Sequence, residues 1–303
     1  MYDVLTIGEL NCDLIMTGLK ELPQLNREIM GDSFQQVLGS STAICAAGLS
    51  ALGLNVGFHG IVGDDDGGRF ACDALAKTGV DVTHCMIDKT VNTGVTIALN
   101  ALGDRALVTY LGAIETFRFD QIDLSLLSQT RHIHVGSFFL QHGLRPGLAK
   151  LFKLAQEAGV TTSLDAGWDD TGEWDGGLAE VLKYTTIFLP NETEAVHATG
   201  AKTPEEAAKR LPVKICVVKC GADGAIAYRD GQLYKGQPFK VTPVDTTGAG
   251  DSFNAGFLYG FLNNLPMEDC LTYGNACGAV SVTKVGGASA CATLADVREK
   301  MAQ

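Results

Sequence analysis

The sequence predicts an α/β fold: a doubly wound, mostly parallel sheet flanked by helices, with a small β-sheet lid. Short apolar segments alternate with helical patterns along most of the 303 residues, and polar residues follow several of these segments. Stretches that alternate like strands interrupt this order twice. We therefore expect one domain spanning residues 1–303, with a lid formed by about residues 14–37 and 91–112.

The first apolar segment, residues 4–7, predicts a strand that ends at a glycine. Asn11 and Asp13 follow it, and the carboxyl edge of a parallel sheet is where ligands bind. Asn and Asp are also frequent turn residues, so a plain turn explains them as well. Next, a turn at Gly39 and Ser40 leads into an Ala-rich helix.

Two groups of residues invite a metal-binding interpretation that the local pattern explains more simply. The run Asp64-Asp65-Asp66 precedes a helix, and we expect Asp64 to cap that helix, which runs to about Lys77. His132 and His134 lie on one strand, but no third ligand is near in sequence, so a structural role is favoured.

Two later strands end in polar residues. A strand over residues 160–164 leads to Asp165, and a strand over residues 187–189 leads to Asn191 and Glu194. Asn191 and Glu194 lie three apart in the first turn of a helix, where their oxygens suit Mg²⁺. An Asn cap with Glu at the third position explains the same pair equally well on local grounds.

A glycine-rich stretch near the C-terminus marks the start of another helix. Phe253, Phe257 and Phe261 recur at i, i+4 and i+8, so the helix should begin at about Ala249 or Gly250. The backbone amides at such a start attract an anion, most often a phosphate.

Asp251 follows these amides in the first turn. A carboxylate beside a bound phosphate would repel it unless it had another task, such as taking a proton from a nucleophile. A tight turn with an Asp cap is the structural alternative.

Longer motifs add to this pattern. The C-terminal stretch closely resembles the signature of the ribokinase-like (PfkB) carbohydrate kinases, and other motifs fall in that family's order. Those motifs are Gly8-Glu9-Leu10-Asn11-Cys12-Asp13, Gly39-Ser40-Ser41, Val62-Gly63-Asp64-Asp65-Asp66-Gly67, Leu189-Pro190-Asn191-Glu192-Thr193-Glu194-Ala195, Lys219-Cys220-Gly221-Ala222-Asp223-Gly224 and Asp245-Thr246-Thr247-Gly248-Ala249-Gly250-Asp251-Ser252-Phe253. No G-x-G-x-x-G follows a strand and no G-x-x-x-x-G-K-[ST] occurs, which excludes dinucleotide-binding and P-loop motifs.

The resemblance implies a ribokinase-like fold and an ATP-dependent kinase that phosphorylates a primary hydroxyl of a sugar. Asp251 would be the general base, and the amides of Gly248, Ala249 and Gly250 would form the anion hole. The implied acceptor-binding residues are Asn11, Asp13, Gly39, Ser40 and Asp165. The implied ATP-binding residues are Asn191, Lys219, Gly221, Gly224 and Asn275.

The same resemblance implies cations and partners. Asn191 and Glu194 would hold Mg²⁺, largely through water, and Asp245 and Thr247 match a K⁺ site of some relatives. In relatives the small sheet covers the sugar and sometimes forms a dimer interface, so a homodimer through the lid is a hypothesis.

Three positions depart from the family's pattern and leave the acceptor open. Ile44 stands where relatives typically hold Asn, and Gly167 and Asp169 replace the Asn and Arg of an Asp-x-Asn-x-Arg pattern. The missing cation weighs against sugar acids and sugar phosphates. A nucleoside kinase of the same superfamily and a non-catalytic sugar-sensing protein remain as alternatives.

Composition limits the partners. The formal net charge of −12 argues against non-specific binding to nucleic acid or anionic membranes. No apolar run approaches the ~18 residues of a membrane span, and no basic segment of the kind that begins a secretory signal opens the chain. Nine scattered cysteines without a C-x-x-C pair predict free thiols in a reducing cytosol, hence a cytoplasmic protein.

Overall fold

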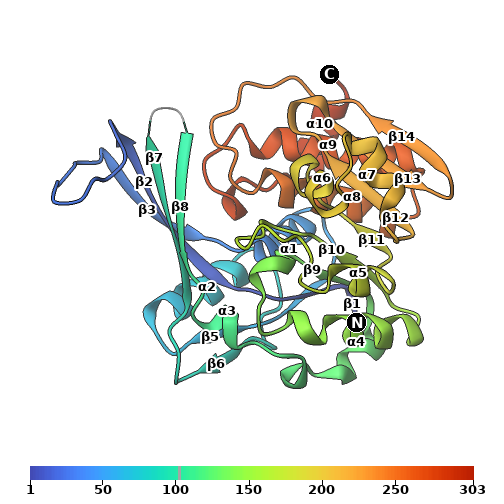
Figure 1. Ribbon diagram of the computed structural model, residues 1–303, viewed down its shortest axis with the longest axis horizontal. Coiled ribbons are helices and arrows are strands. Elements are labelled where there is room, and N and C mark those ends of the chain that lie inside the picture. Colours follow the sequence, from blue (N-terminus) through green and yellow to red (C-terminus); the bar gives the residue numbers. More distant parts are fainter. Residues whose placement is uncertain (102–103) are drawn as a thin grey trace.

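The computed structural model describes residues 1–101 and 104–303. Its centre is an eight-stranded sheet in the order β14-β13-β12-β11-β10-β9-β1-β4 (Figure 1). Six of these strands run parallel, and β13 and β14 are added antiparallel at one edge. The strands are β1 (Tyr2–Ile7), β4 (Val56–His59), β9 (Thr130–Val135), β10 (Thr161–Leu164), β11 (Ile187–Phe188), β12 (Ile215–Lys219), β13 (Ala225–Arg229) and β14 (Gln232–Gly236).

Helices cover both faces of this sheet, as the predicted doubly wound fold requires. Neighbouring side chains of β1 point to opposite faces, so Val4 joins one buried cluster and Leu5 joins the other. The helices against the first cluster are α1 (Ser41–Ala51), α2 (Asp66–Ala76), α8 (Ala249–Leu262), α9 (Met267–Ser281) and α10 (Leu294–Met301). Those against the second are α3 (Ala113–Thr116), α4 (Arg145–Glu157), α5 (Leu178–Leu182), α6 (Glu192–Thr199) and α7 (Pro204–Arg210).

Short elements complete the described chain. A two-stranded sheet pairs β5 (Ile61–Gly63) with β6 (Met86–Asp88). Five single-turn or short 3₁₀ helices are η1 (Phe119–Gln121), η2 (Leu124–Gln129), η3 (Phe138–Leu140), η4 (Gly221–Asp223) and η5 (Ala288–Ala290).

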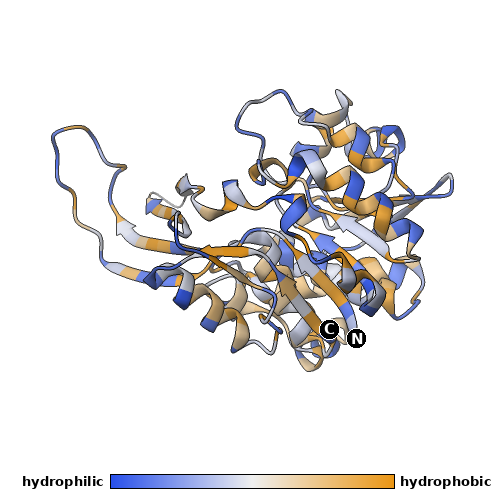
Figure 2. Cartoon of the chain, turned by 90° about the horizontal axis from the view of Figure 1, so that it is seen from below, coloured by the Kyte–Doolittle hydropathy of each residue, from blue (hydrophilic) through white to orange (hydrophobic). Residues whose placement is uncertain are grey.

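The predicted lid is a separate four-stranded sheet in the order β3-β2-β7-β8. Its strands are β2 (Asn11–Leu19), β3 (Ser33–Leu38), β7 (Gly94–Ala101) and β8 (Asp104–Tyr110). Figures 1 and 2 show it projecting from one side of the large sheet and its helices. The strand-like alternation of residues 93–99 and 106–111 predicts a hairpin connection at residues 100–104, part of which, residues 102–103, lies outside the described residues.

The strand β2 begins earlier than the sequence suggested. Asn11 and Asp13 do follow β1, but they belong to the lid strand β2. Asp13 pairs with Thr96 of β7, which in turn pairs with Thr109 of β8, so these polar residues share one lid face. This face therefore presents hydrogen-bonding groups beside the carboxyl edge of the large sheet.

The predicted structural roles of the three aspartates and two histidines are confirmed, with one correction. Asp65 caps α2 by accepting from Gly68 N at 2.8 Å, whereas Asp64 pairs with Arg69. The difference of one residue arises because Asp65 also accepts from Thr93 on the neighbouring segment.

The two histidines bond to hydroxyl groups within the large sheet. Both His132 and His134 lie within hydrogen-bond distance of Ser163 Oγ, at 2.7 Å. Within the described ranges no group of three or more His, Cys, Asp or Glu is arranged to bind a metal ion. Across the same residues, no helix combines the length and apolarity needed to span a bilayer.

Candidate active site

The glycine turn before α8 forms a tight corner. The helix begins at Ala249, as predicted, and Gly248 caps it with φ 71°. A Cβ on Gly248 would stand 2.9 Å from Gly287 Cα and 3.0 Å from Ile44 Cγ2, so a larger residue would displace backbone. The glycine turn and its backbone amides therefore lie in a fixed position beside Asp251, with Ala249 N donating to Thr246 O at 3.3 Å.

Asp251 faces the start of another helix. Its Oδ1 accepts from Ser41 Oγ at 2.5 Å, across 210 residues of sequence. Burial raises the pKa of Asp251 to about 7, with the charge of Asp165 adding to the effect and Lys219 opposing it. A carboxyl with this pKa exchanges its proton near neutral pH, which suits a general base.

Lys219, Asp165 and Asn254 form a closed group next to Asp251. Asp165 Oδ2 accepts from Lys219 Nζ at 2.5 Å and from Asn254 Nδ2 at 2.6 Å. Burial by itself raises the pKa of Asp165, but the attraction of the Lys219 ammonium outweighs it and the net change is downward. The other carboxyl oxygen, Oδ1, accepts from Gly167 N at 3.1 Å.

Asn191 and Glu194 form the capping box that the sequence offered as an alternative. Glu194 N donates to Asn191 Oδ1 at 2.9 Å, and Asn191 N donates to Glu194 Oε2 at 2.8 Å. Burial raises the pKa of Glu194 to about 8, and the nearby charge of Asp165 adds to this. The cap engages only one oxygen of the Glu194 carboxyl, so the box is compatible with cation binding.

Three of the five predicted acceptor residues, Asn11, Asp13 and Gly39, meet where the lid joins the large sheet. A Cβ on Gly39 would stand 2.2 Å from Asp13 Oδ1 and 3.0 Å from Asn11 Nδ2, so these three positions touch. Asn11 Nδ2 also donates to Asp13 Oδ1 and to Thr96 Oγ1, both at 3.3 Å. Ser40 differs, since its hydroxyl is used to cap α1 and to bond the carbonyl of Glu9.

The predicted ATP segment lies at the β12–β14 edge. Gly224 has φ 85°, and a Cβ there would stand 2.3 Å from Gly236 O, so only glycine fits. Asn275 Nδ2 donates to Gln237 O at 3.0 Å and so holds the next loop. A cavity of about 250 Å³, lined in part by Cys220, Asp223, Gly236 and Gln237, adjoins Gly221 and this turn.

Asp245 and Thr247 lie against the loop over residues 284–290. Asp245 accepts from Thr247 N and from Gly286 N, both at 2.9 Å. The two segments that would form a monovalent-cation site are therefore joined by one carboxylate.

Two of the three departures from the family pattern, Ile44 and Asp169, have different surroundings. Ile44 is buried against Gly248 and Gly287, so it supports the glycine turn. Asp169 is buried and accepts from Thr171 and from Trp174 N, so its hydrogen bonds stabilise the loop over residues 169–174. Neither residue is arranged to replace a substrate contact.

Sequence reasoning missed three residues of this site: Glu9, Ser41 and Asn254. Glu9 is buried at the start of α1, where it accepts from Thr42 N at 3.0 Å, from Thr42 Oγ1 at 2.5 Å and from Gln141 Nε2 at 3.0 Å. Burial raises the pKa of Glu9 to about 7. Asn254 could have been found from its spacing of three after Asp251, whereas Ser41 and Glu9 gave no local signal.

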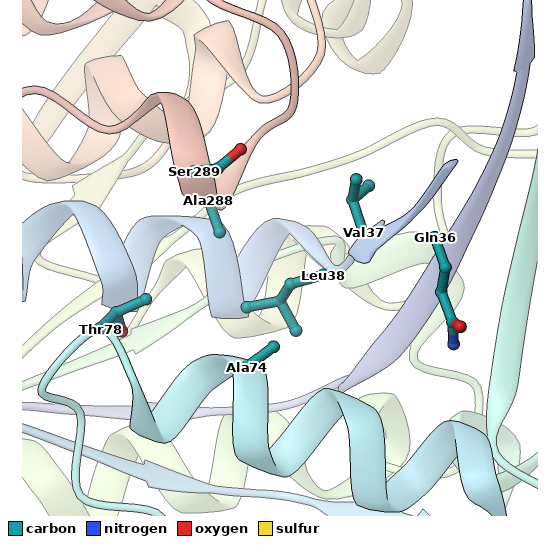
Figure 3. A pocket seen from close by; sticks show the side chains of 7 residues that line it. All are labelled: Gln36, Val37, Leu38, Ala74, Thr78, Ala288 and Ser289. Carbon is teal, nitrogen blue, oxygen red and sulfur yellow. The ribbon is translucent and has the colours of Figure 1, made fainter. Parts of the chain in front are cut away.

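Another cavity, of about 240 Å³, does not have Asp251 in its lining. It sits between β3, the end of α2 and η5, and Figure 3 shows its lining side chains: Gln36, Val37, Leu38, Ala74, Thr78, Ala288 and Ser289. None of these is a predicted site residue, so the candidate active site is defined by the polar groups described above.

Comparison with known families agrees with this geometry. A family model described as pfkB family carbohydrate kinase matches residues 1–294. The chain belongs to this family. It is therefore a sugar kinase, a phosphotransferase with an alcohol group as acceptor.

Individual relatives cover nearly the whole of this PfkB-family chain. An ATP-dependent ribose-1-phosphate kinase from Halopiger xanaduensis is 34% identical over 292 residues, 96% of this chain and 95% of the relative. A 5-dehydro-2-deoxygluconokinase from Clostridium perfringens is 29% identical over 319 residues, covering 98% of this chain and 92% of the relative.

A solved structure confirms the predicted ribokinase-like fold. Arabidopsis thaliana ribokinase, determined in complex with ribose and ATP, superimposes with a TM-score of 0.86 at 24% sequence identity. The match covers 99% of this chain and 98% of the ribokinase.

Proposed function

We propose that the protein transfers the γ-phosphoryl group of ATP to a primary hydroxyl of a neutral sugar or related polyol. The observation that carries the proposal is Asp251: a half-buried carboxyl whose pKa is raised to about 7, in the first turn of α8 directly beside the backbone amides of its glycine turn. The Asp251 carboxylate can accept a proton, and the backbone amides can stabilise negative charge. Phosphoryl transfer to an alcohol requires both.

In the proposed reaction the acceptor hydroxyl replaces Ser41 as the hydrogen-bond donor to Asp251. Asn11 and Asp13 would hold the neighbouring hydroxyls of the acceptor, with Gly39 allowing its close approach. As the new O–P bond forms and the bond to the ADP oxygen breaks, the proton of the hydroxyl passes to Asp251. The amides of Gly248, Ala249 and Gly250 would stabilise charge on the transferred group.

The residues present fit Mg²⁺ and ATP. Glu194 is a buried carboxyl with an oxygen that the capping box does not use, and a hard cation would stabilise its ionised form. Asn191 and Glu194 would hold Mg²⁺ largely through water. When bound, Mg²⁺ neutralises charge on the ATP phosphates, while Gly221, Gly224 and Asn275 would contact the nucleotide.

Two further points remain proposals. A K⁺ ion near Asp245 and Thr247 would neutralise part of the negative charge of this region and hold the glycine turn against the 284–290 loop. A homodimer through the lid is supported by exposed apolar side chains on the lid face opposite Asp13: Phe34, Ile97, Val108 and Tyr110. The nine free cysteines are consistent with the predicted cytoplasmic location.

A second acceptor class is a sugar phosphate. The relative named as a ribose-1-phosphate kinase is 34% identical over 96% of this chain, which favours this class in spite of the missing Arg. The test is an ADP-release assay with ribose, fructose, ribose 1-phosphate, sugar acids and nucleosides. Turnover of a neutral sugar supports the first acceptor, turnover only of nucleosides supports a nucleoside kinase, and no turnover with any acceptor supports the sugar-sensing alternative.

A further inference from the structure

The ring formed by Lys219, Asp165 and Asn254 joins three elements at the carboxyl edge of the sheet. Asp165 follows β10, Lys219 ends β12, and Asn254 lies in the second turn of α8. Besides the two bonds to Asp165 Oδ2, Lys219 Nζ donates to Asn254 Oδ1 at 3.3 Å. Asn254 is fully buried, so both ends of its side-chain amide are committed to this ring.

Both oxygens of the Asp165 carboxylate in this ring accept hydrogen bonds, whereas the Lys219 ammonium has a donor left over. Both oxygens of Asp165 accept bonds, Oδ2 from the ring and Oδ1 from Gly167 N. An ammonium has three donors, and within the described part of the chain Lys219 Nζ uses two of them, toward Asp165 and Asn254. One N–H is therefore left for a ligand.

The ammonium of Lys219 lies close to Gly250. A Cβ built on Gly250 would stand 3.4 Å from Lys219 Nζ, so the ammonium lies against the first turn of α8, beside the amides proposed to hold phosphate. The Lys219 side chain is only 12% exposed and that of Asp165 only 6%. In such surroundings a cation interacts strongly with any nearby anion, since little water screens it.

We propose that Lys219 is held by Asp165 and Asn254 in the nucleotide-free protein and turns to the terminal phosphate when ATP binds. The inference rests on the proposed function, and it makes Asp165 and Asn254 positioning residues for Lys219. Asp165 keeps Asn254 and Gly167 as partners when Lys219 leaves, so its charge is not left without hydrogen bonds. The ion pair thus fixes the ammonium within reach of the phosphate before ATP arrives.

This arrangement makes a prediction that a purely structural ion pair does not. The terminal phosphate is present in ATP and absent from ADP, so Lys219 should contribute to the affinity for ATP and little to that for ADP. A structural role would affect both nucleotides alike, because the fold of the nucleotide site would be disturbed as a whole.

The test measures ATP and ADP affinity by calorimetry with Mg²⁺, for wild type, Lys219→Met and the double variant Asp165→Asn/Lys219→Met. The double variant removes both charges together and so avoids a buried unpaired carboxylate. Its ATP and ADP affinities therefore test the proposal even if the single variant fails to fold. Lys183→Met, at an exposed lysine paired with Glu180, is the matched control.

We expect Lys219→Met and the double variant each to lose ATP affinity by on the order of 10–100-fold, with ADP affinity changed less than about 3-fold. The double variant should also recover the thermal stability that the single variant loses. Recovery of wild-type ATP affinity in the double variant, or equal losses for ATP and ADP, would overturn the proposal.

The proposed function is tested separately by the wild type. If the wild type binds ATP and phosphorylates an acceptor while the double variant binds ATP with wild-type affinity, only the proposed role of Lys219 is contradicted. If the wild type phosphorylates no acceptor, the proposed function itself is contradicted.

Discussion

Replacing Asp251 with Asn should stabilise the nucleotide-free protein at pH 8 while it abolishes most activity. The pKa of Asp251 is raised from 3.8 to about 7, because burial and the charge of Asp165 destabilise its ionised form. The unfolded chain exposes the same carboxyl to water, where it ionises near 3.8. Folding at pH 8 therefore carries a penalty that an uncharged Asn does not have.

The size of this effect follows from the change in pKa. One pKa unit corresponds to about 1.4 kcal/mol, so the penalty at pH 8 is on the order of 2–4 kcal/mol, with the lower end favoured because Asp251 is partly exposed. For a chain of this length that free energy corresponds to a rise in Tm of roughly 3–6 °C. Asn keeps an oxygen that can accept from Ser41, so the loss of that hydrogen bond does not offset the gain.

The pH dependence provides the sharper check. Below pH 4 the Asp251 carboxyl is protonated in both the folded and the unfolded chain, so it does not lower the free energy of unfolding. The penalty grows as the pH rises from 4 toward 7. The stability gained by Asp251→Asn should therefore shrink toward zero near pH 4. Thermal unfolding followed by circular dichroism at both pH values measures it. Asp230→Asn, at an exposed aspartate, is the control and should show no such trend.

Destabilisation by Asp251→Asn at pH 8, or a gain that is the same at pH 4 and pH 8, would refute the reasoning. Destabilisation would mean that contacts in the fold stabilise the carboxylate more than burial destabilises it, and an equal gain at both pH values would mean that the gain does not arise from ionisation of Asp251.

Three further predictions test the same site. Gly248→Ala should lower kcat by at least 10-fold and destabilise the fold by about 1–3 kcal/mol, because φ 71° and the 2.9 Å approach to Gly287 leave no room for a Cβ. Steady-state kinetics measure kcat and thermal unfolding measures stability, and a variant with wild-type kcat and stability would exclude the tight corner. The acid limb of kcat/KM should show an apparent pKa near 7, because Asp251 must be ionised to accept a proton, and a limb near pH 4 would contradict this. Replacing K⁺ with tetramethylammonium should lower the rate if Asp245 and Thr247 hold a cation, and unchanged rates would rule that site out.

The sequence predicted the elements of this fold better than it predicted the contacts within the site. The sequence placed the start of α8 at about Ala249 or Gly250, and the helix begins at Ala249, because apolar periodicity and glycine content change at the same point. The cap of α2 was assigned one residue too early, because Asp65 is selected over Asp64 by its bonds to Thr93, which lies 28 residues away.

The contacts around Asp251 could not be predicted from local patterns for a similar reason. Ser41 reaches Asp251 across 210 residues, and Asn254 joins Asp165 across 89, so only the packed sheet brings them together. Asp165 illustrates the consequence: the sequence suggested an acceptor contact, whereas in the fold its oxygens bond Lys219, Asn254 and Gly167. The acceptor contact by Asp165 stays a prediction.

The most direct measurement is the kcat of Asp251→Ala for an acceptor that the wild type phosphorylates, taken together with its affinity for ATP. If Asp251 is the general base, kcat falls by on the order of 10²–10⁴ while the Kd for ATP stays within about 3-fold of wild type. A variant that keeps the wild-type kcat but loses affinity for ATP would show that Asp251 binds nucleotide and does not take the proton.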